Sequence, residues 1–124
     1  MALSYTAEQE QIRAEARRFL HDAFNPERNR ALLTQSGQFD AAFWQSCVDM
    51  GWTGAGAPEE AGGLGLGPLD VCIVAEECGR FVAAAPFLAA NYAAMIALRD
   101  YAPAAIRDEL IPRIIRGEAR FAAD

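Results

Sequence analysis

The sequence predicts an all-α fold: a bundle of about six helices in a single domain that spans residues 1–124. Three observations predict it. Apolar residues recur at three- and four-residue steps, caps and glycine or proline stops separate these stretches, and no stretch alternates convincingly as a strand would. A length of 124 residues suits one domain, and a chain that is 52% apolar can bury a core.

The first helix is marked by its cap and its periodicity. Thr6 and Gln9 have the spacing of a capping box that opens a helix over residues 7–22. Apolar residues then recur on one face of this helix. We therefore expect its charged side chains, Arg13 and Arg17 among them, to face solvent.

Two more helices and a long loop follow. A proline fits the first turn of a helix, which predicts a short helix over residues 26–33. Asp40 is a good cap for a helix over residues 41–50, and Gly51 fits the left-handed position after its end. Residues 52–67 are too rich in glycine for a regular helix, so we expect a long connection there.

The second half of the chain predicts three helices. One covers residues 68–78 and is closed by the glycine that follows. The next, over residues 84–98, is apolar almost all round, with Asn91 as its one strongly polar residue, which places it in the middle of the core. The last runs over residues 103–117, and Pro112 should kink or split it.

The charge of the chain argues against two classes of partner. The net charge is -6, and an acidic surface repels both nucleic acid and anionic lipid, so we expect neither a nucleic acid nor a membrane as partner. The most apolar stretch is mostly alanine and too weakly hydrophobic to span a bilayer, and no signal-peptide pattern opens the chain. We therefore expect a cytoplasmic protein. Arginine without lysine indicates a GC-rich bacterial source.

Few side chains offer chemistry of their own. Cys47, Cys72 and Cys78 fit no metal site or redox pair and are interpreted as small buried hydrophobic residues. The glutamate pair at 59–60 is interpreted as part of a solvated loop and the pair at 76–77 as a helix-end ion pair, because adjacent residues point in different directions. The residues alone predict no metal site and no catalytic residue.

Four motifs stand in order along the chain: FW at 43–44 leading to GWTG at 51–54, PEEAGGLG at 58–65, EECGR at 76–80, and LIP at 110–112 leading to GE at 117–118. Each motif is weak alone. Together they resemble the N-terminal helical domain of the acyl-CoA dehydrogenase family, over about residues 5–123. The segment 79–88 also resembles actinobacterial members that act on steroid or other bulky acyl-CoAs as mixed-subunit complexes.

The resemblance has two departures. Ala61 stands where the family usually has an aromatic residue, and the chain lacks the Thr-Glu-Pro signature that leads into the family's β-domain. In the family that β-domain and a C-terminal helical bundle hold the FAD, and the bundle carries the catalytic carboxylate. The resemblance therefore implies FAD in the full-length enzyme and neither FAD nor a catalytic residue on this chain. The glycine-rich loop has neither phosphate-binding pattern, so turn chemistry is favoured over an anion site at the next helix start.

The resemblance also implies a part in substrate binding. In the family the helix that corresponds to residues 84–98 lines the acyl-chain pocket, and by position this assigns Phe87, Leu88, Asn91 and Met95 to the pocket lining. The alternative is that all four are ordinary core residues. We also expect the isolated domain to expose some of them as an apolar surface, which would drive self-association or be covered by a neighbouring chain.

Two functions follow from these features. In the first, the chain is the N-terminal substrate-side domain of a FAD-dependent acyl-CoA dehydrogenase, which removes an α-proton and a β-hydride from an acyl-CoA, and it is inactive alone. In the second, it is a non-catalytic helical interaction module or a partner subunit. Both predict a homo- or hetero-oligomer.

Overall fold

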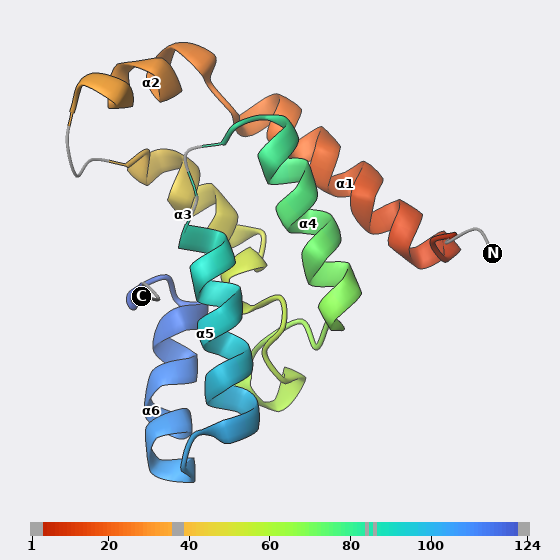
Figure 1. Cartoon of the computed structure of the whole chain (residues 1–124), viewed down its shortest axis with the longest axis vertical. Coiled ribbons are helices and arrows are strands. Elements are labelled where there is room, and N and C mark those ends of the chain that lie inside the picture. The colour runs from red at the N-terminus through yellow and green to blue at the C-terminus, as the bar shows by residue number, and fades with distance from the viewer. Residues whose placement is uncertain (1–3, 36–38, 84, 86, 122–124) are drawn as a thin grey trace.

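The fold is all-α, as the sequence predicts (Figure 1). The computed structural model describes residues 4–35, 39–83, 85 and 87–121, with the backbone alone for residues 87–90. This part of the chain forms six α-helices, three short 3-10 helices and no strand. The α-helices are α1 (Ala7–Ala23), α2 (Pro26–Ala31), α3 (Ala41–Asp49), α4 (Pro68–Arg80), α5 (Phe87–Tyr101) and α6 (Ala104–Ile115), and the 3-10 helices are η1 (Leu32–Thr34), η2 (Trp52–Gly54) and η3 (Glu59–Ala61).

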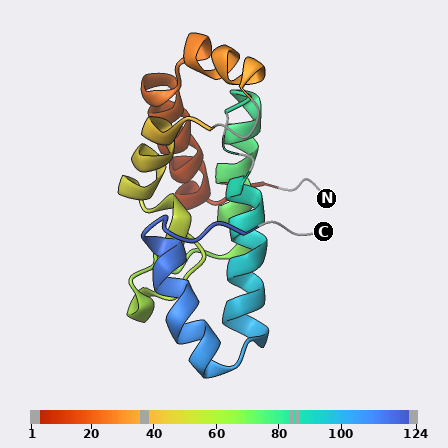
Figure 2. The same cartoon turned by 90° about the vertical axis from the view of Figure 1, so that its left-hand side faces the viewer.

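Two helix pairs and a central connection make up the bundle. α1 packs along α4, and α5 packs along α6 (Figure 1). η2 contacts α3, α5 and α6, so the start of the glycine-rich loop lies in the middle of the molecule. Figure 2 shows the same arrangement from the side, with α2 across one end of the bundle and the α5–α6 pair at the other.

The predicted helix caps are confirmed. The Thr6 hydroxyl accepts a hydrogen bond from the Gln9 backbone N–H at 3.2 Å, and the Thr6 N–H donates to the Gln9 side chain at 3.0 Å. The Asp40 carboxylate accepts from the Phe43 N–H at 3.0 Å. Gly51 has a φ of 78°, the left-handed conformation that ends a helix.

The later helices differ from the prediction at their ends. α4 continues through Gly79 instead of closing there, and α5 begins at Phe87, with Ala85 outside it. α6 runs on through Pro112 without a break. A proline removes the helical bond to the carbonyl four residues earlier, here that of Asp108. Asp108 is exposed, so water can take the place of the lost donor.

The buried side chains form two apolar clusters. The larger joins α1, α3 and α4 and includes Leu20, Cys47 and Val74. The smaller joins the glycine-rich loop to α5 and α6 and consists of Ala57, Met95, Ile111 and Ile114. α5 supplies Tyr92 to the first and Met95 to the second, so it lies between the two clusters, as a helix with little polar surface should.

Candidate functional site

An apolar cavity of about 270 Å³ opens between α4 and α5. α4 supplies Val71 and Cys72 to its wall, and α5 supplies Tyr92, Met95 and Ile96. These positions are spaced by one, three and four residues, so each helix turns one face toward the cavity. An apolar cavity of about 150 Å³ can hold benzene, and this one therefore has room for a larger hydrocarbon group.

A second, polar cavity of about 540 Å³ lies beside the turn between α5 and α6. The charged side chains in its wall are Arg99, Arg107, Glu60 and Asp108. Arg99 also lines the apolar cavity, and it is held in place because its Nη1 donates to the Gly56 carbonyl at 3.1 Å. Its Nε and Nη2 donate to the Asp100 carboxylate at 2.7 and 3.0 Å. The polar wall therefore carries both signs of charge and does not favour a strongly anionic ligand.

Two of the four side chains predicted to line an acyl pocket lie in the described part of the chain. Met95 is buried and stands in the wall of the apolar cavity. Asn91 is fully buried, and its Oδ1 accepts a hydrogen bond from the Phe121 N–H at 3.3 Å. Phe87 and Leu88 belong to the first turn of α5, and their side chains fall outside the described residues. Asn91 and Met95 are both buried, so neither contributes to the exposed apolar surface that was expected to include some of the four residues. That surface, through Phe87 and Leu88, and the pocket lining both stay predictions.

Three residues that were not predicted to line a pocket bring polar groups to the wall of the apolar cavity: Tyr92, Cys72 and Arg99. Tyr92 is buried, its hydroxyl has no partner among the described residues, and burial raises its pKa above the ordinary value of 10.0. Cys72 was expected to be buried but is exposed. Arg99 follows Tyr92 by seven positions on the same face of α5. This helical spacing is the signal that could have identified the face.

The other two cysteines are buried, as predicted. Burial raises the pKa of Cys47 and of Cys78 to about 12. Both thiols therefore stay protonated at neutral pH and behave as small hydrophobic side chains.

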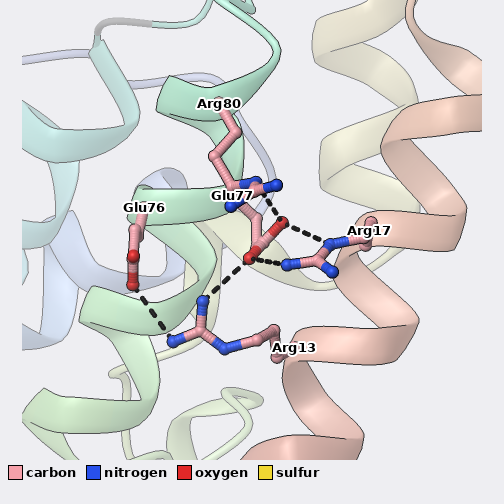
Figure 3. A network of polar contacts seen from close by, with 5 residues as sticks. All are labelled: Arg13, Arg17, Glu76, Glu77 and Arg80. Carbon is pink, nitrogen blue, oxygen red and sulfur yellow. Dashed lines mark hydrogen bonds and ion pairs between the residues drawn. The ribbon is translucent and has the colours of Figure 1, made fainter.

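A polar cluster of five charged side chains lies between α1 and α4 (Figure 3). The Glu77 carboxylate is fully buried and accepts from Arg13 at 2.9 Å and from Arg17 at 2.9 and 3.0 Å, with Arg80 at 3.6 Å. Glu76 binds Arg13 at 3.1 Å. The hydrogen bonds from Arg17, then those from Arg13, outweigh burial and hold the pKa of Glu77 below its ordinary value of 4.5. The prediction that Arg13 faces solvent is wrong, because it turns inward to this carboxylate.

This cluster joins two helices and supplies no general base. A base must take up a proton near the working pH, and a carboxylate with a lowered pKa holds protons poorly. Glu59 and Glu60 are exposed, as predicted for the loop. Within the described residues, no three His, Cys, Asp or Glu side chains are grouped to hold a metal ion.

The cavity walls do not fit FAD, the cofactor that the resemblance implies for the full-length enzyme. The FAD pyrophosphate needs backbone N–H groups or free cations. At the start of α4 the Asp70 carboxylate accepts from the Gly67 N–H at 3.0 Å, which places a negative charge where an anion would bind. Arg99 is neutralised by Asp100. No reaction step is therefore assigned to a flavin on the described residues.

Comparisons with known proteins agree with this architecture. Residues 6–118 match the family described as "Acyl-CoA dehydrogenase, N-terminal domain". The chain is 31% identical to acyl-CoA dehydrogenase FadE26 of Mycobacterium tuberculosis, with 98% of this chain and 31% of that protein covered. It is 32% identical to the mitochondrial isovaleryl-CoA dehydrogenase of Arabidopsis thaliana, over 94% of this chain and 29% of the relative.

Two solved structures share the fold. A variant of the Tcur3481–Tcur3483 steroid ACAD superposes with a TM-score of 0.74 at 31% identity, over 91% of this chain and 31% of that one. The ChsE4–ChsE5 complex of Mycobacterium tuberculosis gives 0.69 at 32% identity, over 95% and 30%. The chain spans about a third of the length of all these relatives. In the described residues, no helix combines the length and apolarity that a membrane crossing requires.

Proposed function

Because this chain belongs to the acyl-CoA dehydrogenase family, as its N-terminal domain, we propose that it is the substrate-side domain of a FAD-dependent enzyme that oxidises an acyl-CoA between its α and β carbons. In this role the chain binds part of the acyl group and excludes water from it. FAD supplies the redox chemistry when it is bound by the full-length enzyme. The chain alone is inactive.

The observation that carries the proposal is the apolar cavity between α4 and α5. Its wall includes Met95, one of the four predicted pocket residues, and is otherwise almost entirely apolar. A hydrocarbon chain that enters it loses contact with water, which favours binding by roughly 25 cal/mol per Å² of buried apolar area. We keep Phe87 and Leu88 as further proposed contacts, whereas Asn91 is not in the wall of this cavity and binds the Phe121 N–H.

The proposal predicts binding that depends on the acyl chain. Titrating the isotope-labelled protein with octanoyl-CoA should shift the Met95 methyl signal in an NMR spectrum, and CoA without an acyl group should not, because only the hydrocarbon enters the cavity. Ala93→Trp should abolish the shift, since Ala93 stands in the cavity wall. Ala14→Trp is the matched control, on the exposed face of α1. An equal response to CoA alone, or none to either compound, counts against the proposal.

A second prediction concerns the cofactor. The protein, mixed with excess FAD and desalted, should retain no flavin in its visible absorbance spectrum, and it should reduce no electron acceptor with any acyl-CoA. The reason is that the cavity walls offer no cradle for the pyrophosphate and no carboxylate placed as a base. Stoichiometric flavin after desalting, or activity that survives repurification, would contradict this.

Assembly with other chains belongs to the same proposal. The ChsE4–ChsE5 relative is a complex, and the Tcur3481–Tcur3483 name joins two components. We propose that this chain works within a homo- or hetero-oligomer, either in a catalytic subunit or in a partner subunit. The exposed Leu69 and Ile96 are apolar positions available to such contacts. Sedimentation velocity of the chain, alone and mixed with a candidate subunit, tests the assembly.

A further inference from the structure

Residues 117–121, called here the exit segment, turn back from α6 and cross the bundle. Gly117 has a φ of 72°, a conformation that suits glycine, and this turn redirects the chain at the end of α6. The Gly117 carbonyl accepts a hydrogen bond from the Trp44 indole N–H at 3.3 Å, which ties the turn to α3. Figure 2 shows the segment crossing α5.

The rest of the exit segment is held at two further places. The Arg120 guanidinium lies 4.4 Å from the centre of the Phe39 ring, a cation–π contact. Phe121 is half-buried and packs against the apolar cluster that contains Met95. The Phe121 N–H donates to Asn91 Oδ1 at 3.3 Å. The segment is therefore held at three places: by Trp44 of α3, by Phe39, which precedes the capping residue of α3, and by Asn91 of α5.

Asn91 is an unusual residue for its place. It is fully buried in a helix that is otherwise almost wholly apolar, and a buried amide costs stability unless it is hydrogen-bonded. Among the described residues its Nδ2 has no partner, so the bond to Phe121 is the compensation that the amide receives. Met95, one turn further along α5, packs in the cluster against which Phe121 rests. The exit segment thus has a hydrogen bond to α5 and packs against the apolar cluster to which α5 contributes Met95.

We propose that Asn91 is a positioning residue that clamps the exit segment against α5 and so fixes the direction in which the chain leaves the helical domain. The inference rests on the proposed function in one respect: in a full-length dehydrogenase this segment leads toward the remaining two thirds of the enzyme. In this proposal Asn91 binds the backbone of the exit segment. Of the two predicted pocket residues whose side chains are described, Met95 is the one that lines the cavity.

Hydrogen exchange without any ligand tests the clamp. Asn91→Leu keeps the size of the side chain but removes the acceptor. Protection of the Phe121 amide should then fall about three- to tenfold, the change that corresponds to one net hydrogen bond. The Gly117 amide, which donates to the Ile114 carbonyl at 2.9 Å, is the internal control and should keep its protection.

Trypsin gives a second readout, which remains informative if one variant folds poorly. Arg120 precedes Phe121, so cleavage after Arg120 should be faster in Asn91→Leu and in Phe121→Ala, which keeps a cleavable bond and removes the ring that packs against the Met95 cluster. Cleavage after Arg18 in α1 should keep its rate. Unchanged exchange at Phe121 in Asn91→Leu, together with a lost response of Met95 to octanoyl-CoA, would overturn the clamp and make Asn91 a pocket contact. If the wild-type protein gives no response to octanoyl-CoA, the proposed function fails while the clamp test stands.

Discussion

Replacing Glu77 by glutamine should lower the free energy of unfolding by about 1.5–3 kcal/mol, because it removes the buried charge that accepts hydrogen bonds from Arg13 and Arg17. Glu77 has no exposed side-chain surface, and Arg13, its partner at 2.9 Å, is only 14% exposed. The glutamine has nearly the same shape but no charge for the three arginines around it. Urea unfolding monitored by circular dichroism measures the loss.

Glu76→Gln is the matched control. Glu76 is the neighbouring residue and binds the same Arg13, but its side chain is 55% exposed. An exposed pair contributes about 0–1 kcal/mol, so this variant should stay close to the wild type. Equal losses in the two variants would show that the burial of Glu77 does not set its contribution.

The pH dependence of stability tests the same ion pairs, because the lowered pKa of Glu77 fixes the direction of the change. The pKa of Glu77 is lowered in the folded state, so its ion pairs contribute fully above the unfolded value, close to 4.5. The contribution is lost as the pH falls below 4.5 and through the folded pKa. The stability difference between wild type and Glu77→Gln should therefore be constant from pH 7 to about 5 and shrink at lower pH. A difference that grows on acidification would contradict the lowered pKa.

Most of the fold could be predicted from local sequence patterns. The caps at Thr6 and Asp40 and the left-handed Gly51 depend on residues within a few positions, and the structure confirms all three. Pro112 does not split α6, and this has a physical reason. A proline removes one hydrogen bond from a helix, and at an exposed position such as Asp108 water can replace the lost donor.

The site depended on contacts that no local pattern contains. The periodicity of the first helix places Arg13 on its polar face, yet its partner Glu77 lies 64 positions along the chain. Asn91 stood out as the polar residue of an apolar helix, but its partner Phe121 lies 30 positions away, in a stretch with no predicted helix. Periodicity shows which face of a helix is apolar. It does not show whether a cavity, another helix or a returning segment covers that face.

Gly63→Ala should destabilise the protein by about 3 kcal/mol, the upper range for forcing extra atoms into a packed site. A Cβ at Gly63 would meet the carbonyl oxygen of Ala57 and would lie 2.5 Å from its Cβ. Ala57 is fully buried, and its carbonyl already accepts from the Gly65 N–H at 2.9 Å, so only a shift of the backbone could relieve the clash.

Substitutions at two other glycines serve as controls, because they separate the effect of this clash from the effects of backbone conformation. At Gly62, with a φ of 92°, an added Cβ would meet nothing within 4 Å, so Gly62→Ala should cost only the strain of the left-handed conformation, about 1–2 kcal/mol. Gly79 lies inside α4 with equally open surroundings, and Gly79→Ala should stabilise the protein by about 0.5–1 kcal/mol through helix propensity. Thermal unfolding of the three variants should therefore rank Gly79→Ala above the wild type and Gly63→Ala last.

Because Gly56 and Pro58, on either side of Ala57, line the apolar and polar cavities, Gly63→Ala should also weaken the response of Met95 to octanoyl-CoA. If Gly63→Ala is no less stable than Gly62→Ala, the loop does not pack against Ala57 as described.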